Sequence, residues 1–210
     1  MMVRIALLGG TFDPIHLGHI HLALAAKQQL AVDEVWLLPN ATPPHKPQPK
    51  ASNQHRLAML SLACEQWPAL QVCDIELKQT GPNYTHQTLQ ALHGAYPQHQ
   101  WVFLMGMDSL VNLPSWKAWD KLLELTHIGV CQRPGWALTP SADIYDYYHH
   151  HLVTQAQLWH TPQGKFTPCE MPAMAVSSSD IRQQIASQRS QEHQLPLTVQ
   201  AYIEANQLYR

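Results

Sequence analysis

The clearest chemical pattern in the chain lies between Gly9 and His19, in the segment G-G-T-F-D-P-I-H-L-G-H. Its glycines allow the backbone to approach a bound group closely. The periodicity that follows predicts a helix, and the first amides of a helix lack partners within it and attract phosphates. His16 and His19 are three positions apart and therefore share one face of the first turn. The segment predicts a phosphate-binding turn with two imidazoles directed at the ligand.

A glycine turn followed by two surface histidines is the alternative, and histidine is common in this chain, with 14 in 210 residues. The segment is not a P-loop, because it has no lysine followed by Ser or Thr, and it is not the G-x-G-x-x-G fingerprint. The placement of both histidines directly after the glycines favours the phosphate-binding interpretation.

A second pattern, V-S-S-S-D-I-R, runs from Val176 to Arg182. Ser177 and Asp180 form S-x-x-D, which predicts the capped start of a helix near Ser178. A cation in the first turn of a helix is disfavoured by the helix dipole by up to about 1 kcal/mol. Arg182 therefore indicates an anion nearby, such as a bound phosphate, with a solvated arginine as the alternative.

Apolar runs and helical periodicity alternate along the whole chain. The predicted strands are 3–8, 34–38, 70–73, 100–105, 127–132 and a possible one within 158–170, and the predicted helices are 17–30, 53–66, 85–95, 116–125, 144–152, 178–187 and 198–206. This alternation predicts an α/β fold with a Rossmann-like open, mostly parallel sheet and helices on both faces. We expect a single domain over residues 1–210, with a small C-terminal helical region from about 177 to 210.

Further candidate residues follow predicted strands, at the sheet edge where ligands bind in such folds. Gly106 and Asp108 follow one strand and Arg133 follows another. Asp108 as a mere helix cap and Arg133 as a surface residue are the alternatives. His45 and Lys46 project from a loop stiffened by the two prolines before them, for which a solvated loop is the alternative.

Aromatic residues mark two other places. Trp116 and Trp119 lie three apart on a predicted helix, a spacing that usually belongs to the core. Tyr84 and Thr85 open another predicted helix, with Thr85 a plausible cap. The run His149–His151 cannot form one face, because neighbours on a helix point apart, and we expect a solvated edge there.

Composition excludes several classes of protein. Hydrophobic residues make up 45% of the chain and supply a core, whereas charged residues reach only 13% and the formal net charge is −2. No broad basic surface for nucleic acid is expected, and no apolar run approaches the roughly 18 residues of a membrane helix. The four cysteines are far apart and form no C-x-x-C, so we expect neither a zinc ribbon nor a disulfide framework, and a reducing cytoplasm as the compartment.

Taken in order, these motifs closely resemble the nucleotidyltransferases with the H-x-G-H motif. The second signature of that family is usually I-S-S-T-x-I-R, from which Val176 and Ser179 are mild departures. Three further segments resemble its nicotinate-nucleotide adenylyltransferase branch: P-P-H-K ending at Lys46, G-M-D-S-L from Gly106 with Trp116 beyond it, and R-P-G from Arg133.

The resemblance implies adenylyl transfer from ATP to nicotinate mononucleotide, giving nicotinate adenine dinucleotide and pyrophosphate, a step of NAD biosynthesis. It implies direct in-line attack without a covalent enzyme intermediate. Mg²⁺ would accompany ATP and be held mainly by its phosphates and water, with no metal ligands from the protein. ATP and nicotinate mononucleotide are the expected partners, with no nucleic acid and no membrane, and the oligomeric state is left open.

The resemblance also assigns site residues. For catalysis they are His16, His19, Lys46 and Arg182. For ATP and its phosphates they are Gly9, Gly10, Thr11, Phe12, Gly18, His45, Gly106, Asp108, Arg133, Ser177, Ser178 and Ser179. For the nicotinate nucleotide they are Tyr84, Thr85, Trp116 and Lys117, with Trp116 stacked on the ring. Many relatives carry a large aromatic residue where this chain has Ala173-Met174, so the strength of the preference for the acid over the amide is left open.

Three other functions share some of these sequence features. Another transferase of the same superfamily is the nearest, but its pantetheine-phosphate branch carries threonine in place of His16 and has shorter chains. A non-catalytic nucleotide sensor or scaffold on the same fold is the second, and the retained histidines, Lys46 and Arg182 argue against it. A nucleotide-dependent oxidoreductase is the third, and the missing G-x-G-x-x-G counts against it.

Overall fold

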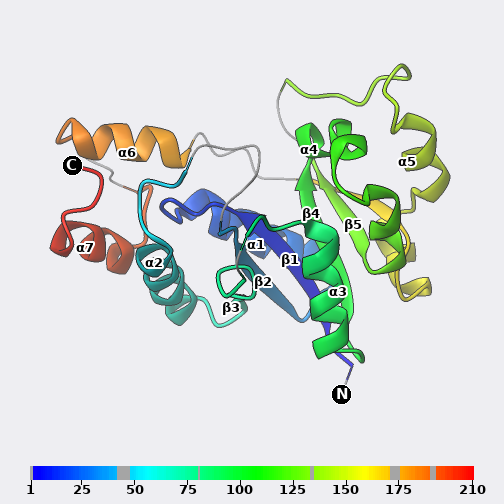
Figure 1. Cartoon of the computed structure of the whole chain (residues 1–210), viewed down its shortest axis with the longest axis horizontal. Coiled ribbons are helices and arrows are strands. Elements are labelled where there is room, and N and C mark those ends of the chain that lie inside the picture. Colours follow the sequence, from blue (N-terminus) through cyan, green and yellow to red (C-terminus); the bar gives the residue numbers. More distant parts are fainter. Residues whose placement is uncertain (1, 42–47, 80, 133–134, 171–175, 190–192) are drawn as a thin grey trace. The chain divides into compact units, whose positions relative to one another are not determined.

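The computed structural model describes residues 2–41, 48–79, 81–132, 135–170, 176–189 and 193–210. Within them one six-stranded sheet has the order β3-β2-β1-β4-β5-β6 (Figure 1). The register of β1 with β4, β4 with β5 and β5 with β6 is parallel. The strands are β1 (Arg4–Gly10), β2 (Glu34–Pro39), β3 (Leu70–Val72), β4 (Gln100–Gly106), β5 (His127–Cys131) and β6 (Phe166–Cys169). The predicted Rossmann-like α/β fold is confirmed, and its strand order reverses between β1 and β4, which is where such folds bind ligands.

The helices agree with the sequence pattern at most positions, and α2 and α3 have the predicted bounds. The α-helices are α1 (Leu17–Gln29), α2 (Asn53–Gln66), α3 (Thr85–Ala95), α4 (Met107–Val111), α5 (Tyr145–His151), α6 (Ser178–Ala186) and α7 (Leu197–Ala205). Short 3₁₀ helices are η1 (Leu113–Ser115), η2 (Trp119–Glu124) and η3 (Gln155–His160). None of these described helices is long and apolar enough to span a membrane.

The helix predicted over 116–125 is correct only in part, because η2 covers Trp119–Glu124 as a 3₁₀ helix and residues 116–118 are not helical. Trp116 follows η1 in extended backbone, with φ −80° and ψ 144°. Ala118 has a positive φ of 53°, which breaks helical continuity before η2 begins at Trp119. Trp119 is half-buried and packs edge-on against Tyr147 at 5.2 Å, so the two tryptophans do not form a core stripe.

The chain divides into two compact units. Unit 1 comprises Met1–Gly9, Ala25–Val35 and Tyr84–Met171. Its core includes β4 and β5, whose interior residues are buried, as expected for the central strands of a parallel sheet. The expectation of a single domain stays a prediction.

Unit 2 comprises Gly10–Leu24, Trp36–Asn83 and Pro172–Arg210. In it α2 buries Met59, Leu60 and Ala63, and α7 buries Val199 and Ile203. The Gln66 side chain donates to the Thr198 hydroxyl at 2.6 Å and joins the two helices. The helical region predicted from about 177 corresponds to α6 and α7, which lie with α2 at the left of Figure 1.

Candidate active site

In unit 2, the turn after β1 is shaped around a buried phenyl ring. Phe12 has a positive φ of 48° and is 1% exposed. A Cβ on Gly10 would lie 2.9 Å from that ring, so a side chain larger than glycine would displace it. The Phe12 side chain belongs to the core, and any ligand contact by this residue is left to its backbone.

The two predicted histidines lie together at the start of α1. Their rings stack with centroids 3.7 Å apart, which confirms that they share one face. The His16 Nδ1 accepts from the backbone N–H of His19 at 3.3 Å, so His16 caps the helix with its ring. Burial lowers the pKa of His16 to about 4. The neutral ring with Nδ1 as acceptor carries its hydrogen on Nε2, which leaves Nε2–H as the donor.

Gly18 is the position where His16 needs room. A Cβ on Gly18 would lie 2.9 Å from the His16 Nδ1 and 3.8 Å from the Val176 Cβ. The amide of Leu17 donates to the Gln194 carbonyl at 2.9 Å. The Gly18 amide has no acceptor among the residues that the structure describes. This amide and the positive end of the α1 dipole are suited to an anion.

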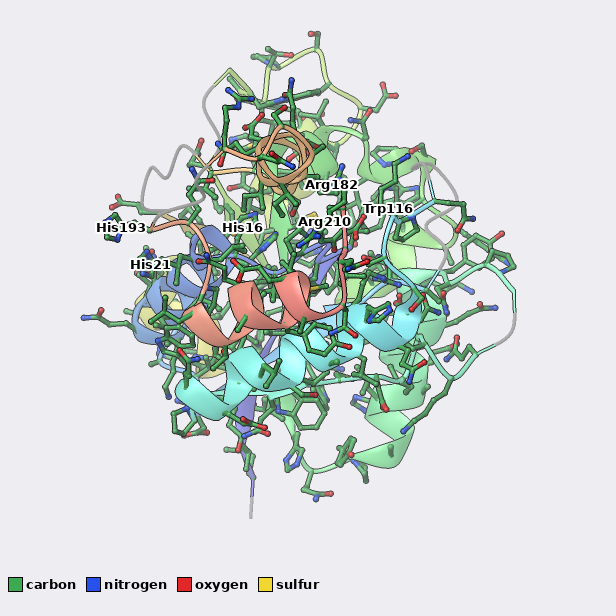
Figure 2. The ribbon with its side chains drawn as sticks, turned by 90° about the vertical axis from the view of Figure 1, so that its left-hand side faces the viewer. His16, His21, Trp116, Arg182, His193 and Arg210 are labelled. Carbon is green, nitrogen blue, oxygen red and sulfur yellow. The ribbon has the colours of Figure 1, made fainter. Side chains whose placement is uncertain are left out.

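Helix α6 is attached to the same turn. Its predicted cap is confirmed, because the Ser177 hydroxyl accepts from the Asp180 amide at 3.1 Å. The Ser178 hydroxyl donates to the Pro14 carbonyl at 3.0 Å, and Arg182 donates to the Asp13 carbonyl at 2.7 Å. Unit 2 therefore brings the two signature segments together although they lie far apart in the sequence (Figure 2).

Arg182 has an anion nearby, as its sequence position indicated, but this anion is a carboxylate of the protein itself. Its guanidinium lies 3.8 Å from the Asp13 carboxylate and donates to the Ser179 hydroxyl at 3.2 Å. It is also the fifth residue of α6, beyond the first turn. Its charge alone is thus no sign of a bound phosphate, but its bonds to Asp13 and Ser179 use only part of its five donors, and its side chain is 27% exposed.

Asp13 is a central residue of this turn that the sequence pattern did not single out. It is 3% exposed, and its carboxylate accepts from the amides of Lys50 at 2.7 Å and Ala51 at 3.0 Å. The Tyr209 hydroxyl donates to the same carboxylate at 2.8 Å. Its place inside the first motif was the available signal, but its partners lie too far along the chain to be inferred from spacing.

Arg56 is a second buried residue that no sequence pattern indicated. Its guanidinium is 0% exposed and donates to the Thr11 carbonyl at 2.6 Å, the Asn40 carbonyl at 2.7 Å and the Asn53 side chain at 2.6 Å. Burial lowers the pKa of Arg56, and the charges of Asp13 and Tyr209 raise it. Arg56 joins the turn after β1 to the end of β2 and the start of α2.

Unit 1 contains the candidate residues for the nicotinate nucleotide. Thr85 was expected to cap α3, but it is the first residue of the helix. Tyr84 occupies the cap position, and its side chain makes no capping hydrogen bond. The amides of Thr85 and His86 have no acceptor in the part of the chain that the structure describes. The Lys117 ammonium lies 4.4 Å from the centre of the Tyr84 ring. Amide donors, a cation and an aromatic ring are therefore associated at the start of α3.

Trp116 lies in the same unit, half-buried and edge-on to Phe103 at 6.5 Å. Gly9 also lies beside Phe103, because a Cβ on Gly9 would lie 3.6 Å from the Phe103 ring. At the end of β4, Gly106 is the cap position of α4, and Asp108 sits in its first turn. The alternative role of Asp108 as the helix cap is therefore wrong.

Several predicted site residues lie outside the described residues: His45, Lys46 and Arg133, together with Ala173 and Met174. Within the described ranges no group of three or more His, Cys, Asp or Glu side chains could hold a metal ion.

Comparisons with known proteins agree on one family. Residues 7–184 match the cytidylyltransferase-like family model. Relatives described as probable nicotinate-nucleotide adenylyltransferases include that of Shewanella frigidimarina, 43% identical over 99% of this chain and 100% of the relative. That of Shewanella sediminis is 42% identical over 99% of both chains.

Solved structures share the fold. A Plasmodium falciparum nicotinic acid mononucleotide adenylyltransferase complexed with NaAD superposes with a TM-score of 0.74 at 19% identity, covering 99% of this chain and 97% of the other. A putative nicotinate-nucleotide adenylyltransferase from Vibrio parahaemolyticus has a TM-score of 0.66 at 17% identity, covering 99% and 96%.

Proposed function

Because this chain belongs to the cytidylyltransferase-like family, and within it to the nicotinate-nucleotide adenylyltransferases, we propose that it transfers the adenylyl group of ATP to nicotinate mononucleotide. The products are nicotinate adenine dinucleotide and pyrophosphate, as in a step of NAD biosynthesis. One observation supports this above the others: two stacked imidazoles and the Gly18 amide lie at the start of α1, joined to Arg182 of α6 through Asp13.

The chemistry is in-line displacement at the α-phosphorus of ATP. An oxygen of the nicotinate mononucleotide phosphate forms a bond to that phosphorus, and the bond to pyrophosphate breaks. The nucleophile is already an anion, so the reaction needs neither a general base nor a covalent enzyme intermediate. Catalysis then rests on positioning the two substrates and on stabilising the charge that develops on pyrophosphate.

The unit 2 cluster is suited to the triphosphate. His19, the Nε2–H of His16 and the Gly18 amide would donate to phosphate oxygens, and Arg182 would neutralise charge on the leaving group. Because the fixed donors lie in a partly buried turn, they need little reorganisation as charge develops. The two joined segments also contain smaller candidate residues for the phosphates: Gly10, Thr11, Ser177, Ser178 and Ser179. The roles of His45, Lys46 and Arg133 stay predictions from the resemblance.

The unit 1 cluster is suited to the nicotinate nucleotide. The amides of Thr85 and His86 would hold the nicotinate carboxylate at the start of α3. Trp116 offers a flat face for stacking on the pyridine ring. Lys117, held over Tyr84, adds positive charge that favours the acid over the neutral amide.

The donors in unit 2 are N–H groups, O–H groups and a guanidinium, which suit phosphate oxygens rather than a cation. We therefore propose that Mg²⁺ is held by the ATP phosphates and water, and it would lower the charge on the triphosphate. The cytoplasm remains the proposed compartment, in keeping with four cysteines that form no disulfide: Cys64, Cys73, Cys131 and Cys169.

The test is a pyrophosphate-release assay with ATP and Mg²⁺ and one of three acceptors: nicotinate mononucleotide, nicotinamide mononucleotide or pantetheine phosphate. We expect release with nicotinate mononucleotide, together with formation of the dinucleotide. Release with pantetheine phosphate alone would assign the chain to a different transferase. ATP binding without release from any acceptor would support the sensor interpretation instead.

A further inference from the structure

The segment after α7 returns to the turn that follows β1. In this segment, residues 206–210, the Tyr209 hydroxyl donates to the Asp13 carboxylate at 2.8 Å, across 196 positions of sequence. Burial, followed by the charge of Asp13 and its hydrogen bond, raises the pKa of Tyr209, so its hydroxyl stays protonated and remains a donor. The contact is a charge-assisted hydrogen bond inside unit 2, of the stronger kind.

The backbone of this segment is held in an unusual conformation. Gln207 and Tyr209 have positive φ values of 52° and 65°, which residues other than glycine rarely adopt. Such residues persist where the surroundings determine them. The surroundings here include the bond of the Leu208 amide to the Ile203 carbonyl at 3.1 Å and the bond of Tyr209 to Asp13.

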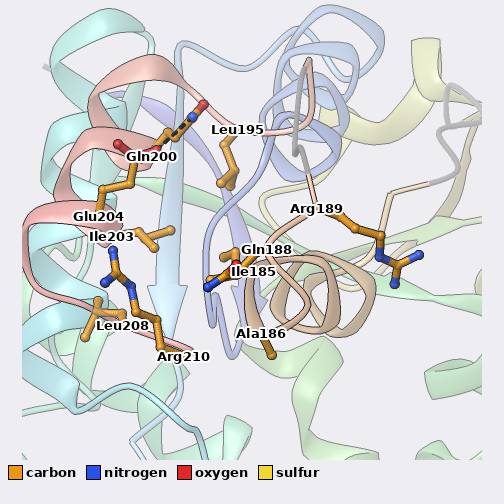
Figure 3. Close-up of a pocket in the computed structure, with 10 residues that line it drawn as sticks. All are labelled: Ile185, Ala186, Gln188, Arg189, Leu195, Gln200, Ile203, Glu204, Leu208 and Arg210. Carbon is orange, nitrogen blue, oxygen red and sulfur yellow. Dashed lines mark hydrogen bonds between the residues drawn. The ribbon is translucent and has the colours of Figure 1, made fainter.

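The segment borders a cavity. Leu208 and Arg210, the neighbours of Tyr209, line a cavity of about 530 Å³ that also borders Ile185 and Ala186 of α6 (Figure 3). The bond from Tyr209 to Asp13 is a contact that ties this segment to the turn after β1.

Asp13 connects Tyr209 to Arg182, one of the residues proposed to bind the triphosphate. Its carboxylate also receives the amides of Lys50 and Ala51, just before α2, and the Arg182 guanidinium lies 3.8 Å from it. The two contacts are on different oxygens, because Tyr209 donates to Oδ1, which also accepts from the Ala51 amide, whereas Arg182 lies 3.8 Å from Oδ2. Removal of the Tyr209 hydroxyl would take one donor from this buried carboxylate. The less compensated carboxylate would attract the Arg182 guanidinium toward Asp13 and away from a bound phosphate.

We propose that Tyr209 is a positioning residue for adenylyl transfer: its hydroxyl satisfies the Asp13 carboxylate and so keeps Arg182 directed at the phosphates of ATP. This inference rests on the proposed function. It adds the segment after α7, which none of the sequence motifs includes, to the machinery of unit 2.

The first test is Tyr209→Phe, with Tyr202→Phe as the matched control. Tyr202 also bonds through its hydroxyl, to the His55 ring at 2.9 Å, but it has no bond to Asp13. We expect Tyr209→Phe to lower kcat/KM for ATP by about 10-fold, the usual scale for losing a hydrogen bond to a charged group. The KM for nicotinate mononucleotide should stay within about twofold, and Tyr202→Phe should behave like the wild type.

A double-mutant cycle distinguishes positioning from general loosening. If Tyr209 acts through Arg182, then Tyr209→Phe should have almost no further effect on kcat/KM in an Arg182→Ala background. An equal fold-loss in both backgrounds, or unchanged ATP kinetics in the single variant, would overturn the proposal. All rates are compared well below the melting temperature of each variant, so a drop in melting temperature with normal kinetics also counts against it.

Calorimetric titration with ATP separates this inference from the proposed function. If the wild type binds ATP but does not act on nicotinate mononucleotide, the proposed function fails. The inference is then judged by whether Tyr209→Phe weakens ATP binding and Tyr202→Phe does not. Equal ATP affinity in the wild type and in Tyr209→Phe would reject it, as would no ATP binding by the wild type.

Discussion

His16 and His19 have different parts at the start of α1. The Nδ1 of His16 is engaged by the His19 amide, and its ring is 5% exposed, so it shapes the turn and offers a single donor. The His19 ring stacks on it, lies edge-on to Phe12 at 4.9 Å, and is only half-buried. Of the two, His19 is therefore better placed to reach a ligand from solvent.

We expect His19→Ala to lower kcat by roughly 10²- to 10³-fold, the usual loss for one donor to a developing oxyanion, while the protein stays folded. The matched control is His21→Ala, an exposed histidine on the same helix (Figure 2). Steady-state rates and far-UV circular dichroism check both variants. Near-normal turnover in His19→Ala would remove this residue from the mechanism.

At the scale of elements, the site depends on how helices begin. Helix α1 begins beneath an imidazole cap, α6 begins at a serine cap, and α3 begins with no side-chain cap. The donors at α1 and α3 are backbone amides, so their direction is set by the helix start and not by a flexible side chain.

Gly18→Ala should therefore impair activity although alanine favours helices. The new Cβ would meet the His16 ring at 2.9 Å and displace the cap. We expect at least about a 10-fold loss of kcat/KM for ATP, as for other misplaced catalytic groups. Gly94→Ala in α3 is the control, because a Cβ there meets nothing within 4 Å, and it should leave the kinetics unchanged. Similar kinetics in both variants would contradict the role of the cap.

Trp116→Ala tests the cluster of unit 1. Loss of an aromatic surface for stacking should raise the KM for nicotinate mononucleotide by about 10-fold, since stacking on an aromatic side chain contributes about 1–3 kcal/mol per base. The KM for ATP should change little. Trp136→Ala removes a tryptophan that is 46% exposed and serves as control. A rise confined to the KM for ATP would refute the assignment.

At the scale of the whole molecule, both units bury a neutral histidine, His16 in unit 2 and His127 in unit 1. Burial lowers the pKa values of His16 and His127 to about 4, against 6.5 for the unperturbed group. Between these values the unfolded chain holds more protons than the folded one, so stability is present above pH 6.5 and is lost as the pH falls toward 4.

We expect the free energy of unfolding, measured with urea, to fall between pH 7 and pH 5. His127→Gln should make this fall shallower, because one of the two buried histidines no longer titrates. Carboxylates contribute equally in both proteins, so the comparison isolates the histidine. An identical pH dependence in the variant and the wild type would show that His127 titrates normally in the folded state.

The sequence predicted the sheet and most element bounds, because those follow from local periodicity. The approach of the two signature segments was implied by the family resemblance alone, which assigns both segments to the phosphates of ATP. It missed the break at Ala118, since a positive φ in a non-glycine residue leaves no trace in hydrophobic spacing. It also missed Arg56 and the bond of Tyr209 to Asp13, because a buried polar contact across the chain is decided by tertiary packing. Lys46, His45 and Arg133 lie outside the described residues, so their roles stay predictions.

The most direct test is a crystal structure with an ATP analogue whose α–β bridge resists cleavage. We expect phosphate oxygens within hydrogen-bond distance of the Gly18 amide, the His19 ring and the Arg182 guanidinium. A triphosphate bound elsewhere, with both imidazoles unengaged, would contradict it.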